Sequence, residues 1–283
     1  MKKTAITFVL LISAVAAWNI LVAYVDKELS GREHKGVYQS CHKIWAARGL
    51  YNSHDERNSI TSFRRAFEHG TQGGEVDFSY DVKMNRFIVS HGHPKKDADG
   101  NFIYPKKEGE LLTLEHLFQA AGEGHYFWLD YKNLEHLSAE ETRLAIARLL
   151  DITEENGLRE RLYIEGSNPL KLSRYTQAGF KTILGVHPLP QSNPFASIVI
   201  NAYKVAYSFT DITAVALGYG SIDDPVYGED TEKSFGSIPI FLFHVPDNEA
   251  LLQSLVRKNG VRVILVGRDK SIDRYSINSC KKP

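Results

Sequence analysis

The chain has 283 residues, of which 43% are hydrophobic and 24% charged, and its formal net charge is zero. This length and composition suit one large globular domain with a substantial core. Because no basic excess is present, we expect no nucleic-acid partner and no binding of a large polyanion, and we expect recognition to take place in a local pocket.

The N-terminal segment is apolar. Residues 5–25 carry no charge and follow Met1-Lys2-Lys3. A segment of this length can span a bilayer, with its positive end on the cytoplasmic side. Ala14-Val15-Ala16 also offers a signal-peptidase site, so a cleaved signal peptide stays open beside an uncleaved anchor. Residues 1–25 are predicted to be one or the other, with the remaining chain exported to the periplasm or the outside of the cell.

Residues 26–40 are polar and lack apolar periodicity, which predicts a linker between this segment and a domain at 41–283. Export also changes the interpretation of the two cysteines, Cys41 and Cys280. In an oxidising compartment they are candidates for a disulfide, and two unpaired buried thiols are the alternative.

Short strand-like runs alternate with helical ones along this domain. The helical patterns include residues 59–70, 139–156 and 248–259. The predicted strands are Lys43–Arg48, Gly74–Phe78, Tyr126–Tyr131, Arg161–Glu165, Lys181–Gly185, Ile212–Leu217, Ile238–Phe243 and Val261–Val266. Eight such alternations predict an α/β fold, a (β/α)₈ TIM barrel with its active face at the carboxyl ends of the strands. A closed barrel places its first and last strands side by side, which would bring Cys41 near Cys280.

Residues 85–124 depart from the simple alternation. They are predicted to contain an extra strand at 86–90, a polar loop at 94–109 and a helix with Leu111, Leu114, Leu117 and Phe118 on its apolar face. An insertion over a barrel mouth is typically a lid or a substrate loop.

Three short stretches at predicted strand ends carry the candidate chemistry: Glu75-Val-Asp77, His91-Gly-His93-Pro94 and Asp130-Tyr-Lys132. Residues i and i+2 of a strand point to the same side, so Glu75 and Asp77 share one face. Glu75 and Asp77 sit inside an otherwise apolar and aromatic run and Asp130 follows another, so all three are expected to be partly buried and to need a cation. The alternative is a solvated strand face. Hard oxygen ligands suit Mg²⁺ or Ca²⁺, so the sequence predicts one divalent cation at the barrel mouth.

These motifs resemble those of the superfamily that contains the glycerophosphodiester phosphodiesterases and the sphingomyelinase D-type phospholipases. The run Ile44-Trp-Ala-Ala47-Arg48-Gly49 is similar to their first strand, and Asn58-Ser59-Ile60 to the start of their first helix. The acidic and histidine motifs named above are especially similar to the sphingomyelinase D version, and 238–269 resembles the last two strands of the phosphodiesterases.

The resemblance implies a barrel that binds one Mg²⁺ or Ca²⁺ and cleaves a phosphodiester, as a hydrolase or a lyase. Its substrate would be a glycerophosphodiester, a phospholipid or an envelope phosphodiester, and the oligomeric state stays open. By resemblance, His91 is a general acid/base and Arg48 and Lys132 bind the phosphate. The implied metal ligands are Glu75, Asp77 and Asp130.

One position departs from this pattern. Ala47 stands where the phosphodiesterases carry their first catalytic histidine, and a methyl group cannot transfer a proton. His54 is the candidate to replace this catalytic histidine. His93 is a second candidate, or it binds the phosphate. The third possibility is a catalytically silent barrel that binds a phosphorylated headgroup or scaffolds an envelope assembly. A barrel glycosidase is a further alternative, which Lys132 argues against.

Other histidines fit simpler roles. His125, His187 and His244 stand singly in strand or loop contexts, and we interpret each as a structural residue.

Overall fold

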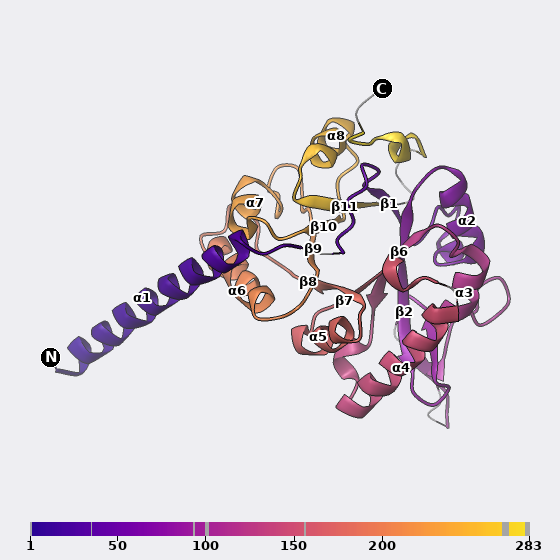
Figure 1. Ribbon diagram of the computed structural model, residues 1–283, viewed down its shortest axis with the longest axis horizontal. Helices are drawn as coiled ribbons and strands as arrows, with labels where there is room; N and C mark the ends of the chain where they lie inside the picture. The colour runs from indigo at the N-terminus through magenta and orange to yellow at the C-terminus, as the bar shows by residue number, and fades with distance from the viewer. Residues whose placement is uncertain are drawn as a thin grey trace.

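A computed structural model describes residues 2–34, 36–92, 94–99, 102–155, 157–267 and 272–280. Eight parallel strands form a closed barrel, because β1 pairs with both β2 and β11 (Figure 1). The barrel strands are β1 (Ile44–Ala47), β2 (Gly73–Asp81), β6 (Tyr126–Tyr131), β7 (Leu162–Gly166), β8 (Lys181–Gly185), β9 (Ala214–Gly218), β10 (Ile240–Phe243) and β11 (Val261–Val266). The predicted TIM barrel is confirmed.

Helices connect these strands and surround the barrel (Figure 1). They are α2 (Ile60–Glu68), α3 (Leu114–Ala121), α4 (Ala139–Glu155), α5 (Pro169–Gln177), α6 (Ala196–Ser208), α7 (Glu229–Phe235) and α8 (Glu249–Arg257). Short 3-10 turns lie at η1 (His54–Glu56), η2 (Leu134–His136), η3 (Arg159–Arg161) and η4 (Ile272–Ser276). Side-chain caps start several helices: Ser59 accepts from the Ser62 amide, Asn168 from Lys171 and Asn248 from Leu251.

Aromatic side chains fill the barrel interior. Trp45, Trp128, Tyr163 and Phe241 are fully or almost fully buried there, and the rings of Trp128 and Phe241 lie 5.3 Å apart. Gly73 makes room for this packing, since a Cβ atom there would lie 2.7 Å from the Trp45 ring. The interior is therefore a packed core below the carboxyl ends of the strands.

The predicted insertion follows β2. Strand β3 (Arg86–Val89) pairs antiparallel with β2, and a two-stranded hairpin, β4 (Lys95–Lys96) and β5 (Phe102–Ile103), extends from it. Helix α3 then returns the chain to the barrel. Whether this insertion acts as a lid stays a prediction.

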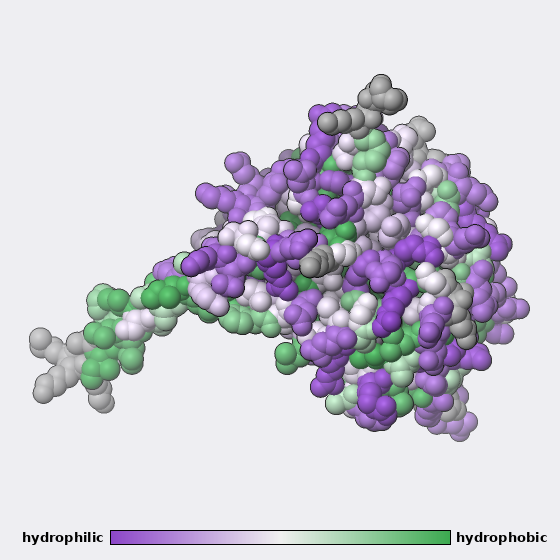
Figure 2. Space-filling view, in the orientation of Figure 1, coloured by the Kyte–Doolittle hydropathy of each residue, from purple (hydrophilic) through white to green (hydrophobic). Residues whose placement is uncertain are grey.

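The N-terminal segment differs from the prediction in one respect. Helix α1 runs from Lys2 to Ser30, so the first part of the predicted linker is helical. Leu29, Val37 and Tyr38 are buried against the barrel. The sequence did not predict these apolar contacts, because most residues of this segment are polar. Residues Ile6–Ser30 form a helix long and apolar enough to cross a membrane, and Figure 2 shows most of α1 as an apolar rod projecting from the barrel.

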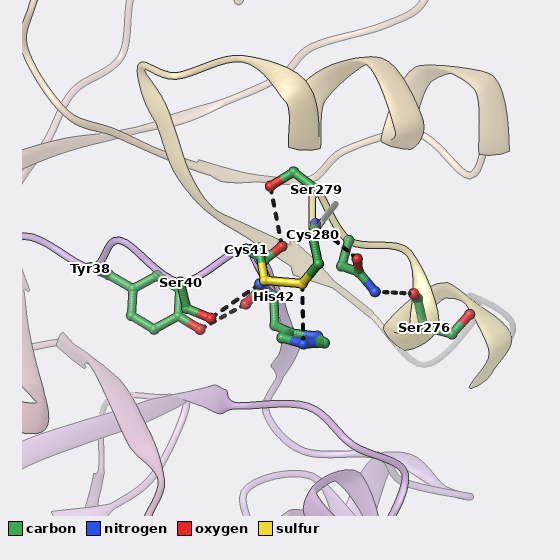
Figure 3. Close-up of a disulfide and its surroundings, with 8 residues drawn as sticks. Tyr38, Ser40, Cys41, His42, Ser276, Ser279 and Cys280 are labelled. Atoms are coloured by element: carbon green, nitrogen blue, oxygen red, sulfur yellow. Dashed lines mark hydrogen bonds between the residues drawn. A yellow bond between two sulfur atoms is a disulfide. The ribbon is translucent and has the colours of Figure 1, made fainter. Parts of the chain in front are cut away.

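A disulfide joins Cys41 to Cys280, as the sequence predicted (Figure 3). The Ser279 amide donates to the Cys41 carbonyl at 3.0 Å, so the C-terminal segment lies against the start of β1. The closed order of the barrel, with β1 beside β11, brings these distant residues together.

Candidate functional site

Three carboxylates converge at the carboxyl ends of two neighbouring strands. Glu75 and Asp77 lie on β2, and Asp77 pairs in register with Asp130 on β6. One carboxylate oxygen of each lies within 4.8 Å of the other two. Glu75 and Asp77 are buried, and Asp130 is partly exposed to the cavity. The structure thus brings together the three acids that the sequence singled out, in a donor set that suits a hard divalent cation.

Two basic side chains accompany the acids. Lys132 Nζ lies 2.6 Å from Asp77 Oδ1 and also forms an ion pair with Asp130. Arg48 Nε lies 4.0 Å from Glu75 Oε2. Arg48 has a φ of 61°, a left-handed conformation that non-glycine residues seldom adopt and that is often found at functional sites.

The charges of these groups perturb one another. Burial, and then the nearby charges of Asp77 and Asp130, raise the pKa of Glu75 well above its usual value. Burial also raises the pKa of Asp130, against the opposing effect of Lys132. For Asp77 burial acts in the same direction, but Lys132 and Asn58 outweigh it and the pKa is lowered. The site therefore holds more carboxylate than its ammonium neutralises, which favours an added cation.

Asn58 fixes the orientation of Asp77. Its Nδ2 donates to Asp77 Oδ2 at 2.7 Å, and its Oδ1 accepts from the Asp77 amide at 3.2 Å. Asn58 is buried with a φ of 58°, and its amide donates to the Arg48 carbonyl. The sequence pattern placed Asn58 at the start of a helix but did not reveal its hydrogen bonds with Asp77.

A cavity of about 510 Å³ opens over these groups. Its polar lining comes from Arg48, Tyr51, Glu75, Asp77, His91, Trp128, Asp130, Lys132, Glu165 and His244. Ala47, Phe243, Val245, Pro246 and Leu265 supply apolar walls. Pockets with a few convergent polar groups and perturbed pKa values are typical of active sites.

The histidines separate into two groups. His91 lines the cavity, and burial lowers its pKa, opposed by Asp77. His54 is exposed on η1, outside the cavity lining, and its ring lies 6.5 Å from that of Tyr51. His93 lies outside the described residues. The structure therefore places one of the two predicted catalytic histidines in the cavity.

His244 is the second imidazole in the cavity lining. It follows β10 directly, with a φ of 50°, and burial lowers its pKa, with a further contribution from Arg48. Ala47, which stands where the phosphodiesterases carry their first catalytic histidine, lines the same cavity. The sequence interpretation of His244 as purely structural missed this position, because a lone histidine after a strand carries no pattern. Its place at a strand's carboxyl end was the available signal.

Glu165 adds a fourth acid. It pairs in register with Asp130, and its Oε2 accepts a hydrogen bond from Trp128 Nε1 at 2.6 Å. Burial, followed by the charge of Asp130, raises the pKa of Glu165 to about 8. A carboxyl group that titrates near neutral pH can hold or release a proton in the cavity.

Comparison with solved structures gives close matches in fold at low sequence identity. A glycerophosphodiester phosphodiesterase from Parabacteroides distasonis matches with a TM-score of 0.55 at 15% identity, over 81% of this chain and 94% of that one. The enzyme from Thermotoga maritima matches with a TM-score of 0.53 at 16% identity, over 80% and 94%.

A phosphodiesterase from Oleispira antarctica, solved in complex with the product sn-glycerol-3-phosphate, matches with a TM-score of 0.56 at 13% identity, over 83% of this chain and 94% of that one. No protein-family model matches the sequence, and no curated protein matches it. The agreement with the solved structures is one of fold. This chain therefore shares the barrel fold of the glycerophosphodiester phosphodiesterases.

Proposed function

We propose that this protein is a metal-dependent phosphodiesterase held at a membrane by α1. The observation that carries the proposal is the convergence of Glu75, Asp77 and Asp130 beside His91 in one cavity at the carboxyl ends of the barrel strands. The barrel shared with phosphodiesterases supports it, although fold alone does not determine chemistry.

The three acids are the proposed ligands of one Mg²⁺ or Ca²⁺. The donor atoms are close enough, and the burial of Glu75 and Asp77 next to like charge makes a cation favourable. When bound, the cation would polarise the phosphate and offset the negative charge that grows in the transition state.

Arg48 and Lys132 are proposed to hold the non-bridging phosphate oxygens. Both line the cavity, and the Lys132 ammonium forms ion pairs with Asp77 and Asp130, beside the proposed metal position. Charge-assisted hydrogen bonds of this kind position a phosphate and stabilise its developing charge.

His91 is proposed as one acid/base group. Its lowered pKa keeps the imidazole neutral at pH 7, in the form that accepts a proton from an attacking hydroxyl or water. If a neighbouring hydroxyl of the substrate attacks phosphorus, the alcohol leaves and a cyclic phosphate forms first, as in a lyase. If water attacks phosphorus, the phosphodiester is hydrolysed directly to a phosphomonoester.

The second acid/base group is proposed to be His244. It lines the same cavity as Ala47, so the histidine that follows β10 takes the place of the one missing from β1. His54, the replacement suggested by sequence, lies outside the cavity lining, which favours His244.

A panel of phosphodiesters tests the enzyme against the silent alternative. The full-length protein in detergent, with Mg²⁺ or Ca²⁺, is expected to release a phosphomonoester or a cyclic phosphate from at least one member. The His91→Ala variant is expected to lose this turnover, whereas His187→Ala, an exposed histidine outside the cavity lining, keeps it. Saturable binding of sn-glycerol-3-phosphate without turnover of any phosphodiester would support the silent barrel instead.

A further inference from the structure

The C-terminal third of α1 is part of the barrel domain. Val25 and Leu29 are buried in the core, and Asp26 Oδ1 lies 2.6 Å from the buried ammonium of Lys204 on α6. Just beyond the helix, Arg32 donates to the Thr210 carbonyl at 2.9 Å. These contacts hold α1 at a fixed angle to the barrel, so the direction in which it leaves the domain is set by the fold.

Helix α1 runs in the same direction as α6. Val22 and Asp26 share a surface hollow with Ala196 and Ile200 near the start of α6, whereas Leu29 shares one with residues 208–210 at its end. Figure 1 shows α1 leaving the domain beside α6. The free part of α1 therefore extends beyond the end of α6 at which that helix begins.

That end of α6 is the cavity side of the barrel. In a (β/α)₈ barrel each helix starts at the carboxyl end of the preceding strand and runs back along the outside. The carboxyl ends of the strands also carry Asp77, Asp130 and His244. Helix α1 thus projects from the face that holds the cavity, with its tilt set by packing against α6.

The length of the free part decides how near a bilayer comes. The helix from Ile6 to Ile20 precedes the docked section, which starts at Leu21, and a rise of about 1.5 Å per residue gives it a length of roughly 22 Å. A hydrocarbon core is about 30 Å thick. The free part is shorter than this thickness, so an α1 that spans the core leaves no spacer, and the cavity face beside α6 lies at the membrane surface.

Exposed apolar side chains lie on the cavity face of the barrel, near the starts of the helices. They are Leu170 in the first turn of α5 (75% exposed), Phe195 at the N-cap of α6 (61%), Ile198 in its first turn (52%) and Ile222 in the loop between β9 and α7 (56%). They belong to three consecutive strand–helix units, and the middle unit contacts α1. We call these four residues the apolar rim.

We propose that the apolar rim docks on the bilayer that holds α1, so that the cavity faces lipid headgroups and takes the phosphodiester of a membrane lipid. The docking stands on the orientation of α1 and the position of the rim. The choice of substrate class also rests on the proposed phosphodiesterase activity.

Fluorescence quenching tests the docking. Full-length Phe195→Cys and Ile222→Cys variants carry an environment-sensitive label and are reconstituted in phosphatidylcholine–phosphatidylglycerol vesicles that contain a lipid-borne quencher. Phe209→Cys is the matched control, because Phe209 is an equally exposed phenylalanine (66%) at the opposite end of α6. Strong quenching at 195 and 222 with little at 209 is expected. Equal quenching at all three sites, or stronger quenching at 209, would overturn the proposal.

Two substrates test the lipid assignment. The triple variant Phe195→Ser, Ile198→Ser, Ile222→Ser is expected to turn over a vesicle phospholipid roughly tenfold more slowly, because it loses apolar contact with the bilayer. Turnover of soluble glycerophosphocholine should stay unchanged, and Phe209→Ser should affect neither. Equal loss on both substrates, or none on the vesicle lipid, would contradict lipid presentation. Absence of turnover on both by the unmodified protein would refute the proposed function and the lipid assignment with it, while the quenching result still decides the docking.

Discussion

Asn58 Nδ2 donates to Asp77 Oδ2 at 2.7 Å, and this bond leaves the other carboxylate oxygen, Oδ1, facing Lys132. The Asp77 carboxylate is therefore held in one orientation by an amide from the loop after β1. Asn58 is a supporting residue for the acid cluster in the same way that hydrogen-bond partners orient metal ligands in other proteins.

The first prediction concerns this support. Asn58→Ala leaves Asp77 Oδ2 and the Asp77 amide without their partner, and a buried unsatisfied polar group costs about 1–3 kcal/mol. The variant should unfold at a lower temperature than the parent, and its cation affinity should fall by roughly 10–100-fold. Thermal unfolding with and without Mg²⁺ or Ca²⁺ measures both effects. An unchanged cation response would show that Asn58 does not orient a ligand.

The second prediction is the response to a divalent cation. A ligand present at 100 times its dissociation constant stabilises the native state by about 2.7 kcal/mol, so saturating Mg²⁺ or Ca²⁺ should raise the melting temperature by several degrees. Asp130→Asn should remove this rise. Asp151→Asn, an exposed acid on α4, is the matched control and should keep it. A melting curve that is insensitive to both cation and chelator would contradict the metal site.

The third prediction follows from the raised pKa of Glu75. A folded carboxyl group with a raised pKa binds more protons than the unfolded one, so it lowers the stability of the cation-free protein as the pH rises above about 4.5. Glu75→Gln removes this loss. The variant should therefore melt at a higher temperature than the parent at pH 7 in chelator, and should lose the cation response.

The same shift governs cation binding. The cation needs the ionised carboxylate and competes with its proton, so the stabilisation by Mg²⁺ or Ca²⁺ in the parent should increase with pH through the raised pKa. Melting temperatures between pH 5 and about 9 test this dependence. A cation effect that is constant over the range would show that Glu75 is already ionised at its lower end.

The fourth prediction concerns the two imidazoles. His91→Ala and His244→Ala should each lower phosphodiester turnover by roughly 10²–10⁴-fold, the usual contribution of an acid/base group. His187→Ala is the control. Because Ala47 and His244 line the same cavity, Ala47→His should partly restore turnover in the His244→Ala background. Full activity of His244→Ala would assign the second proton transfer to another group.

The fifth prediction concerns the disulfide between Cys41 and Cys280. Its sequence separation of 239 residues means that it constrains most of the unfolded chain. The chain-entropy model gives such a closure at most about 5 kcal/mol. The double variant Cys41→Ser, Cys280→Ser should therefore melt well below the parent, and a reductant should lower the melting temperature of the parent alone. Equal melting of the two proteins would show that the bridge contributes little.

The barrel could be predicted because its strands are short apolar runs between helical patterns. Strands β6, β8 and β11 begin and end at the predicted residues. The acids were also visible, since Glu75 and Asp77 interrupt an apolar strand and Asp130 follows one. The alternation within a strand and the fixed geometry of the barrel together place such residues at one mouth.

Contacts between distant segments were not visible in the sequence. Glu165 and His244 reach the cavity, and Asn58 reaches Asp77, through strand register and loop conformation, which no local pattern encodes. The docking of α1 was hidden for the same reason. Asp26 looks like a linker residue until Lys204, far along the chain, is seen beside it.

Turnover of a phosphodiester by the full-length protein tests the central claim most directly. We predict release of a phosphomonoester or cyclic phosphate that requires Mg²⁺ or Ca²⁺, stops in chelator and is lost in both Glu75→Gln and His91→Ala. Binding of sn-glycerol-3-phosphate with no turnover of any phosphodiester in either cation would contradict it.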